Sequence, residues 1–232
     1  MRCAIMQPTY LPWLGYFHMI AKVDLFVFLD DVQFSKRSWQ QRNKIAVNSS
    51  EKYLTIPVKN KGLREQNINE VRIDNDSKWQ NQHIQLIKYS YSKYPFFNDI
   101  ERILSHYNYR KEYLSDFTIN LIVDIAEQFG LSTPIIKSSE LPVCGKRSEY
   151  LYEICKYVNA SEYLSAAGSR EYIEQEGIFE DKEIMINYHQ SEPYKYVQYG
   201  TNSFIPYLSV IDYIANQGFS SFSSQILDIS SN

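Results

Sequence analysis

The sequence runs RCAIM at residues 2–6, QPTYLP at 7–12, LGYFHMIAKV at 14–23 and LFVFL at 25–29, and this stretch decides the fold. The first and last runs are apolar and of strand length. LFVFL does not alternate between apolar and polar residues, as expected of a strand covered on both faces. Two prolines exclude regular structure at 7–12, and the run after them is expected to be helical. Strand, loop, helix and strand form a βαβ unit, which implies a parallel sheet.

Working outward from this unit, the pattern predicts an α/β fold with an N-terminal Rossmann-like (nucleotidyltransferase-like) parallel sheet, flanking helices and a helix-rich C-terminal half. We expect residues 1–75 to form a βαβ nucleotide- or sugar-binding portion, 76–222 a helix-rich portion packed on the same domain, and 223–232 a flexible tail. Further strands are predicted at 53–58, 71–73, 134–138, 162–165 and 183–187, and further helices at 79–92, 96–105, 112–129, 148–158 and 204–216.

Composition is that of a globular protein. The 232 residues are 44% hydrophobic and 22% charged, which argues against disorder. The formal net charge is −3, so nothing supports DNA binding or other non-specific contact with nucleic acid. Cys3, Cys144 and Cys155 form neither a disulfide framework nor a zinc motif, which suits a reducing cytoplasm. No apolar stretch approaches the ~20 residues that span a bilayer, and the N-terminus lacks a signal-peptide pattern, so we expect a cytoplasmic protein without membrane insertion.

The loop after the first strand is the first candidate site, because open α/β sheets bind ligands beyond the carboxyl ends of their strands. A loop there that leads into a helix also offers free N–H groups to a phosphate or carboxylate. The alternative is a proline-stiffened aromatic plug with a structural role only. The candidate substrate-binding residues are Gln7, which both donates and accepts, Gly15, which permits close approach of a ligand, and Tyr10, Trp13 and Tyr16, which offer stacking faces.

Two acids at the end of the second strand, Asp30 and Asp31, are the candidate catalytic carboxylates. Adjacent strand residues point to opposite faces, so we expect one of them to face the pocket as a general base or hydroxyl acceptor. Asp31 is favoured for that position, and Asp30 is expected to support the loop that carries Lys36 and Arg37. A solvated strand end is the alternative for both.

A basic stretch follows these acids and supplies candidate ligands for a diphosphate. Arg37 and Arg42 have guanidinium forks suited to bidentate phosphate contacts. Lys36 and Lys44 add positive charge, and Asn43 lies between the cations as a further candidate substrate-binding residue. The alternative is an ordinary solvated basic stretch.

Three other features are candidates of lower rank. His18 lies one turn into the first helix and is a candidate proton acceptor, with a packed or surface histidine as the alternative. His189 is a possible contribution to the site from the second half of the chain. Residues 165–170 predict an anion-binding turn or, alternatively, an ordinary helix entry capped by Ser169. The four histidines show no metal-ligand spacing, so no metal site is predicted.

Residues 13–16, Trp-Leu-Gly-Tyr, occupy the place where many nucleotidyltransferases and pantothenate-synthetase-like ligases have His-x-Gly-His, and residues 27–34 resemble the strand and loop that follow. Both histidines are missing here. Because those imidazoles stabilise the leaving pyrophosphate, the comparison favours the fold more than adenylyl transfer.

A second resemblance is more specific. MQPTYLPWLGYF at 6–17, and FLDDVQF at 28–34 with RNK at 42–44, strongly resemble the WbqC-like protein family. One departure is Ala166-Ala167, where a glycine-richer turn is expected. Matching stretches at 79–94, 138–141, 163–165 and 206–212 extend the resemblance over nearly the whole chain.

The resemblance implies an enzyme of bacterial surface-polysaccharide (O-antigen) synthesis. It would transfer an amino acid such as glycine, or another acyl group, onto the amine of a nucleotide-linked amino sugar. The cofactor is open, and ATP or another activated acyl donor is the expectation. The alternatives are a nucleotidyltransferase or adenylate-forming ligase of the same pathway, and a non-catalytic nucleotide-sugar-binding or assembly protein.

Overall fold

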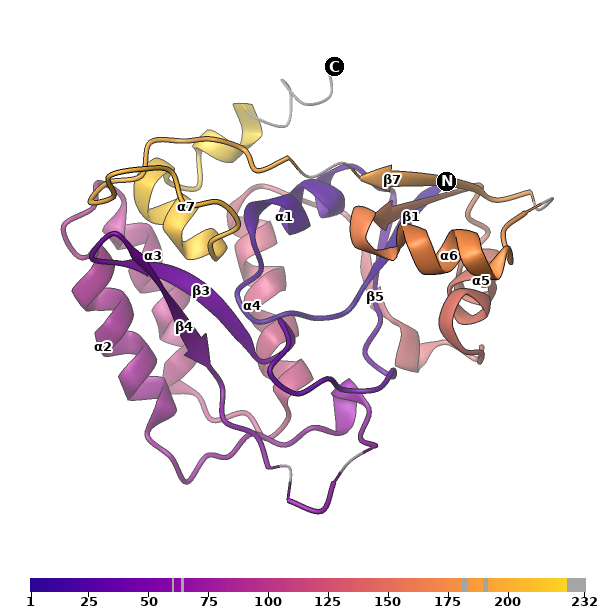
Figure 1. The fold of residues 1–232 in the computed structure, drawn as a ribbon, viewed down its shortest axis with the longest axis horizontal. Coiled ribbons are helices and arrows are strands. Elements are labelled where there is room, and N and C mark those ends of the chain that lie inside the picture. The colour runs from indigo at the N-terminus through magenta and orange to yellow at the C-terminus, as the bar shows by residue number, and fades with distance from the viewer. Residues whose placement is uncertain (60, 64, 181–182, 190–191, 225–232) are drawn as a thin grey trace.

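The structure, a computed structural model, describes residues 1–232 apart from 60, 64, 181–182, 190–191 and 225–232. A five-stranded parallel sheet lies at its centre with helices on both faces, which confirms the predicted α/β, Rossmann-like fold (Figure 1). In their order across the sheet the strands are β5 (Ile135–Lys137), β2 (Leu25–Phe28), β1 (Arg2–Met6), β6 (Glu162–Ala166) and β7 (Met185–His189).

The order of the strands determines where this sheet can bind a ligand. Counted along the chain, the strands lie in the order 3-2-1-4-5, which is the doubly wound Rossmann arrangement. The chain moves outward from β1 to β5 in one direction and from β6 to β7 in the other, so the switch point lies between β1 and β6. Open α/β sheets bind ligands beyond the carboxyl ends of the strands at this point.

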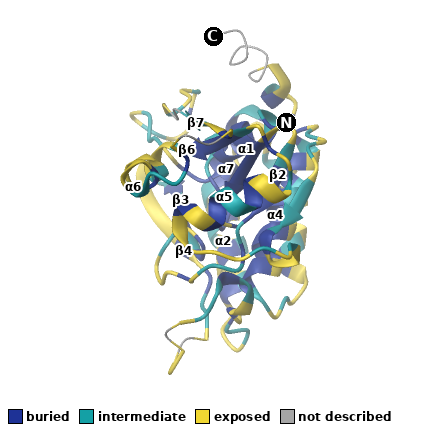
Figure 2. Ribbon diagram, turned by 90° about the vertical axis from the view of Figure 1, so that its right-hand side faces the viewer, coloured by how far each residue is buried: buried dark blue, intermediate teal, exposed yellow. Residues whose placement is uncertain are grey.

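Helices of two groups cover the two faces of the sheet, with α1 and α4 on one side and α5 and α6 on the other (Figure 1). α7 is almost entirely buried, whereas α6 is mostly exposed (Figure 2). The helices are α1 (Leu14–Ala21), α2 (Trp79–Tyr91), α3 (Phe97–Leu104), α4 (Leu114–Gln128), α5 (Arg147–Tyr157), α6 (Arg170–Glu176) and α7 (Val210–Gln217), with 3-10 turns at Ile68–Glu70, Ser105–Asn108, Ser138–Glu140 and Ala167–Ser169.

Strand residues divide between two hydrophobic cores, one on each face of the sheet. Ala4 of β1 packs into the core that contains α1, α4 and α7, and its neighbours Cys3 and Ile5 pack into the core that contains α5. On β2, Phe26 and Phe28 join the first core and Val27 the second. Successive strand side chains point to opposite faces, so strands buried on both sides need apolar residues at every position. This requirement explains the unbroken apolar run of β2.

An antiparallel hairpin outside the main sheet was missed by the sequence patterns. β3 (Arg42–Val47) pairs with β4 (Ser50–Thr55), whereas we expected a polar stretch and then a strand at 53–58. Asn48 and Ser49 make the turn between them with φ of 49° and 62°. A two-residue turn with both φ values positive suits the twist of a hairpin, but it usually contains glycine. Because Asn48-Ser49 contains no glycine, the sequence lacks the pattern that usually identifies a two-residue hairpin turn.

Both predicted portions contribute to the central sheet. Residues 1–75 supply β1 and β2, and residues 76–222 supply β5, β6 and β7 along with most of the helices. The predicted strand at 71–73 is reduced to isolated bridges. The predicted helix at 204–216 begins only at Val210, where Ser209 caps it by accepting a hydrogen bond from the Ile211 N–H at 3.3 Å. The predicted tail, 223–232, falls mostly outside the described residues.

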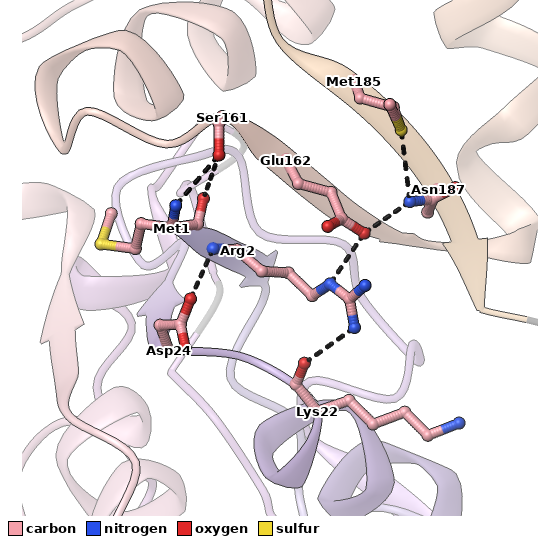
Figure 3. A network of polar contacts seen from close by, with 8 residues as sticks. All are labelled: Met1, Arg2, Lys22, Asp24, Ser161, Glu162, Met185 and Asn187. Atoms are coloured by element: carbon pink, nitrogen blue, oxygen red, sulfur yellow. Dashed lines mark hydrogen bonds and ion pairs between the residues drawn. The ribbon is translucent and has the colours of Figure 1, made fainter. Parts of the chain in front are cut away.

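A polar network holds the strands together at the end of the sheet opposite the carboxyl ends (Figure 3). The Arg2 Nε atom lies 2.7 Å from Glu162 Oε1, and Arg2 Nη1 donates to the Lys22 carbonyl at 3.4 Å. The Arg2 backbone N–H donates to Asp24 Oδ2 at 2.7 Å. The network joins the amino ends of β1 and β6 to the C-terminal end of α1. It therefore lies at the opposite end of the sheet from the carboxyl ends of these strands.

Candidate functional site

A groove lies beyond the carboxyl ends of β1, β2 and β6. It consists of two neighbouring cavities of about 870 and 440 Å³, which share Gln7, Leu29, Leu151 and Tyr172 as wall residues. We call these two cavities the switch-point groove, because they occupy the place at which open α/β sheets bind ligands. Its walls come from the loops after β1, β2 and β6 and from the first turns of α5.

Asp31 lines the switch-point groove and is held by hydroxyl donors. The Tyr150 hydroxyl donates to Asp31 Oδ2 at 2.6 Å, and the Ser138 hydroxyl donates to Asp31 Oδ1. Burial and the neighbouring Asp31 carboxylate raise the pKa of Tyr150, so this phenol stays protonated and keeps donating. The arrangement fixes the carboxylate orientation and leaves each oxygen further capacity to accept, which suits a general base.

Asp30 points away from the groove into the protein. It is 2% exposed and accepts hydrogen bonds from the Ser139 N–H at 3.1 Å and the Ser139 hydroxyl at 2.8 Å. We expected Asp30 to support the loop with Lys36 and Arg37; it instead holds the 3-10 turn after β5. The same turn carries Ser138, so Asp30 anchors a hydroxyl that contacts Asp31.

Two cations line the larger cavity at the start of α5, Lys146 and Arg147. Gly145 allows this loop to approach the helix, because a Cβ there would lie 2.8 Å from Tyr150 Cα. Arg147 has a φ of 53°, which is costly for a residue with a side chain, and its Nε pairs with Glu176. Neither cation was predicted as a site residue. The sequence Gly145-Lys146-Arg147 directly before a predicted helix could have indicated an anion-binding position.

The four cations that we expected to bind diphosphate do not line the groove, although Ser38, Trp39 and Gln40 of the same stretch line its smaller cavity. Lys44 Nζ pairs with Glu51 Oε1 at 2.7 Å, and the Arg42 guanidinium lies 4.5 Å from the centre of the Tyr53 ring. Lys36 and Arg37 are exposed and line neither cavity of the groove. Arg42 and Lys44 belong to strand β3 of the hairpin, and both contact side chains of the paired strand β4.

Asn43 has a structural contact within the same hairpin. It is buried, and its side-chain N–H donates to the Leu11 carbonyl at 2.6 Å. Leu11 has a φ of 45°, so Asn43 holds a strained residue of the loop after β1 in position. We therefore remove Asn43 from the candidate binding residues.

The loop after β1 divides its predicted residues between the groove and the core. Gln7 lines both cavities of the groove, and its side-chain carbonyl accepts from Gln40 Nε2 at 2.8 Å. Tyr10 and Tyr16 are fully buried and offer no ring face to a ligand. Their hydroxyls are satisfied inside the protein: Tyr10 contacts His83 Nδ1 at 2.9 Å, and Tyr16 donates to the Gln7 carbonyl at 3.0 Å. Both tyrosines belong to the core, as the plug alternative expected.

Trp13, Gly15 and His18 line a third cavity of about 300 Å³, which we call the aromatic cavity. Trp13 also lines the switch-point groove, but His18 does not. His18 is 7% exposed, and burial together with His189 and Lys22 lowers its pKa to about 4. The two candidate proton acceptors His18 and Asp31 therefore line different cavities.

The turn after β6 does belong to the groove. Ser165, Gly168 and Ser169 line its smaller cavity, although Ser165 itself is buried. The Ser165 and Ser169 hydroxyls lie 2.5 Å apart, and Ser169 also donates to the Ala166 carbonyl at 2.6 Å. Internal hydrogen bonds thus occupy these hydroxyls. Other wall residues that sequence reasoning did not assign to a site are Gln33, Asn67, Tyr150, Leu151 and Tyr172.

Within the described residues, no group of three or more histidine, cysteine or carboxylate side chains is placed to hold a metal ion. None of the helices in the described part of the chain combines the length and the apolarity required to cross a bilayer.

Comparison with known proteins gives the family. Residues 7–224 match the WbqC-like protein family. The chain is 30% identical over 219 residues to "Uncharacterized protein Rv1507c" of Mycobacterium tuberculosis (strain H37Rv), with 94% of each chain covered. No solved structure matches the chain. The matched region includes the loop after β1, Asp31 and the start of α5, and the protein belongs to the WbqC-like protein family.

Proposed function

We propose that the chain is an enzyme that transfers an amino acid, such as glycine, or another acyl group onto the amine of a nucleotide-linked amino sugar. Its setting would be the synthesis of a bacterial surface polysaccharide such as O-antigen. The observation that carries the proposal is a carboxylate, Asp31, that lines the same cavity as two cations, Lys146 and Arg147. The acyl chemistry and the pathway come from the sequence resemblance.

The groove supplies what this reaction needs from a protein. Lys146 and Arg147 attract the diphosphate, with Arg147 able to make bidentate contacts. The sugar amine then lies toward Asp31. Its nitrogen attacks an activated carbonyl, the N–C bond forms, and the donor's leaving group departs with the electron pair. Asp31 takes the proton lost from the nitrogen.

A mass measurement tests the proposal directly. The protein is incubated with a UDP- or dTDP-linked amino sugar, ATP and glycine, and the expected product is the sugar nucleotide with one glycyl group added. Acyl thioesters serve as donors in a parallel series. If no amino sugar gains an acyl group with any donor, while the protein is folded and binds the sugar nucleotide, the enzyme proposal fails and the non-catalytic binding alternative stands.

A nucleotidyltransferase or adenylate-forming ligase is the second candidate, favoured by the 3-2-1-4-5 strand order of the sheet. Trp13 and the buried Tyr16 occupy the positions of the two histidines that would stabilise pyrophosphate. Isotope exchange between pyrophosphate and ATP separates the candidates. Exchange that depends on a carboxylic acid substrate would favour the ligase, and exchange that needs only a sugar phosphate would favour the nucleotidyltransferase.

A further inference from the structure

The aromatic cavity contains two buried polar atoms that the described residues leave without a partner. Nε1 of Trp13 and Nε2 of His18 are buried and make no hydrogen bond within the described part of the chain. Both side chains line this cavity. His18 is more than nine-tenths buried, with 7% of its surface exposed. Since buried polar atoms are nearly always paired in native proteins, two such atoms at one cavity indicate that something else supplies the partner.

The size and walls of the cavity indicate a single ring. Its volume of about 300 Å³ is at the lower end of the ~300–1,000 Å³ typical of ligand pockets. The walls are rich in aromatic side chains, which stack on flat or apolar ring faces. These side chains are Trp13, Tyr194, Tyr196, Phe204, Tyr207 and Tyr213.

The charges around the cavity favour an uncharged ligand. Burial lowers the pKa of His18 to about 4, so its imidazole is neutral at physiological pH. Lys22 and Glu192 also line the cavity and carry opposite charges. An indole N–H can only donate, so the ligand must present an acceptor to Trp13, whereas a neutral imidazole can donate or accept.

Gly15 leaves the space that the indole of Trp13 occupies. A Cβ at this position would lie 2.5 Å from Trp13 Nε1, so any other residue would displace the ring. Glycine in a helix costs up to about 1 kcal/mol relative to alanine in helix propensity. α1 therefore carries an unfavourable residue where the indole approaches its first turn. The close approach explains why glycine is present there.

We propose that the aromatic cavity is a second ligand site that binds one uncharged ring with hydrogen-bond acceptors on its edge, from either a nucleobase or a pyranose. Trp13 Nε1 donates to an acceptor on the ring, and His18 Nε2 makes a second edge contact. Because Trp13 also lines the switch-point groove, the ring lies next to a ligand in that groove. The site does not depend on the acyl-transfer proposal, since none of its contacts involve Asp31 or the cations of α5.

Binding of two ring probes to the full chain tests the site. Uridine represents a nucleobase and methyl glucopyranoside represents a pyranose, and both are titrated by calorimetry and by saturation-transfer NMR. We expect one probe to bind. Binding of uridine alone identifies a base as the ligand, and binding of the glycoside alone identifies a sugar. If neither probe binds up to its solubility limit, the proposal is overturned.

Substitutions then locate the bound ring. His18→Phe keeps the ring that stacks 5.4 Å from Phe222 but removes Nε2, and Trp13→Phe removes the indole donor. Each is expected to weaken binding roughly tenfold or more, as loss of one buried hydrogen bond does. Gly15→Ala, which displaces the indole, should do the same. Trp39→Phe is the matched control, because Trp39 lines the groove and not the aromatic cavity.

Stability measurements distinguish a ligand site from a structural role. In the absence of ligand, His18→Phe should melt at the same temperature as the wild-type protein or higher, because it removes an unpaired buried nitrogen. A fall in melting temperature without loss of probe binding would assign His18 to the core and overturn the proposal. Binding that survives His18→Phe but is lost in Asp31→Asn would assign the ring to the switch-point groove, with the same consequence.

Discussion

Asp30 and Asp31 are neighbours in sequence but have opposite surroundings. Asp31 faces the switch-point groove, whereas Asp30 is buried against the turn that contains Ser138 and Ser139. Strand geometry predicts this difference in direction, but only the position of the turn after β5 determines which carboxylate is buried. The two residues can therefore be separated by the same isosteric substitution.

Asp31→Asn is expected to impair the chemical step. An amide has nearly the shape of the carboxylate but cannot take a proton from an attacking amine, so turnover should fall by about 10²-fold or more. The melting temperature should fall less than in Asp30→Asn, because Asp31 is only partly buried and water in the cavity can replace the hydrogen bond that the amide cannot accept. Initial rates of the mass-gain assay measure the effect. Unchanged turnover would exclude Asp31 as the general base.

Asp30→Asn is expected to impair stability instead. The amide has one acceptor oxygen and cannot accept from both the Ser139 N–H and the Ser139 hydroxyl as the carboxylate does, so one buried donor loses its partner. The expected cost is about 1–3 kcal/mol of unfolding free energy, measured by urea denaturation. A stable Asp30→Asn protein with greatly reduced turnover would reverse the roles assigned to the two acids.

The two cations of the groove lie where the loop after β5 meets α5, and Gly145 lets this loop pack closely against Tyr150. The Gly145→Ala methyl group would meet Tyr150 Cα at 2.8 Å and Tyr150 N at 2.9 Å, so backbone atoms must move. We expect a loss of about 1–3 kcal/mol in stability, as overpacking does, together with weaker binding of sugar nucleotides. Thermal unfolding measures the stability change.

Gly168→Ala provides the comparison for that experiment. Gly168 lies in another turn of the groove, and a Cβ there meets no atom within 4 Å. Its melting temperature should change little. Equal stability of the two alanine variants would show that the loop moves freely and that Gly145 does not position the cations.

Strands and helices were predicted from sequence with uneven success, for physical reasons. β1, α1 and β2 could be predicted, because strands buried on both faces need unbroken apolar runs. The β3–β4 hairpin was missed, because its strands are partly exposed and its turn uses Asn48 and Ser49 without glycine. Because the hairpin was not predicted, Arg42 and Lys44 were expected to lie in a binding site and not on a strand of this hairpin.

The sequence of the loop after β1 does not predict which of its aromatic side chains are buried and which line a cavity. Tyr10 is buried because it reaches His83 in α2 and Tyr107 in the 3-10 turn after α3, far away in sequence. Trp13, three residues later, lines two cavities. Local sequence is similar for both, so only tertiary packing separates a core tyrosine from a candidate ligand contact.

Asp212 joins several parts of the molecule through one buried carboxylate. It accepts from the Tyr91 hydroxyl of α2 at 3.0 Å and from the Tyr196 hydroxyl at 2.8 Å and Gln198 Nε2 at 3.0 Å in the segment before α7. Tyr91 in turn accepts from the Ala46 N–H of β3 at 3.0 Å. α2, β3, α7 and a wall of the aromatic cavity therefore share one ionisable group.

The charge state of Asp212 should make the stability of the whole protein depend on pH. Burial raises its pKa from 3.8 to about 6, so the folded chain holds this proton more tightly than the unfolded chain. Its contribution to stability is full below about pH 4 and is lost as the pH rises through about 6. The loss is on the order of 2–3 kcal/mol.

Asp212→Asn isolates this contribution from those of other acids. The unfolding free energies of the wild-type and Asp212→Asn proteins are measured in urea at intervals from pH 4 to pH 7. Because the amide does not titrate, their difference should change across this interval, with the wild-type protein losing stability relative to the variant as the pH rises. A difference that is constant with pH would mean that Asp212 binds its proton equally well in the folded and the unfolded chain. In that case the four joined segments would be held by hydrogen bonds whose strength does not depend on titration of this carboxylate.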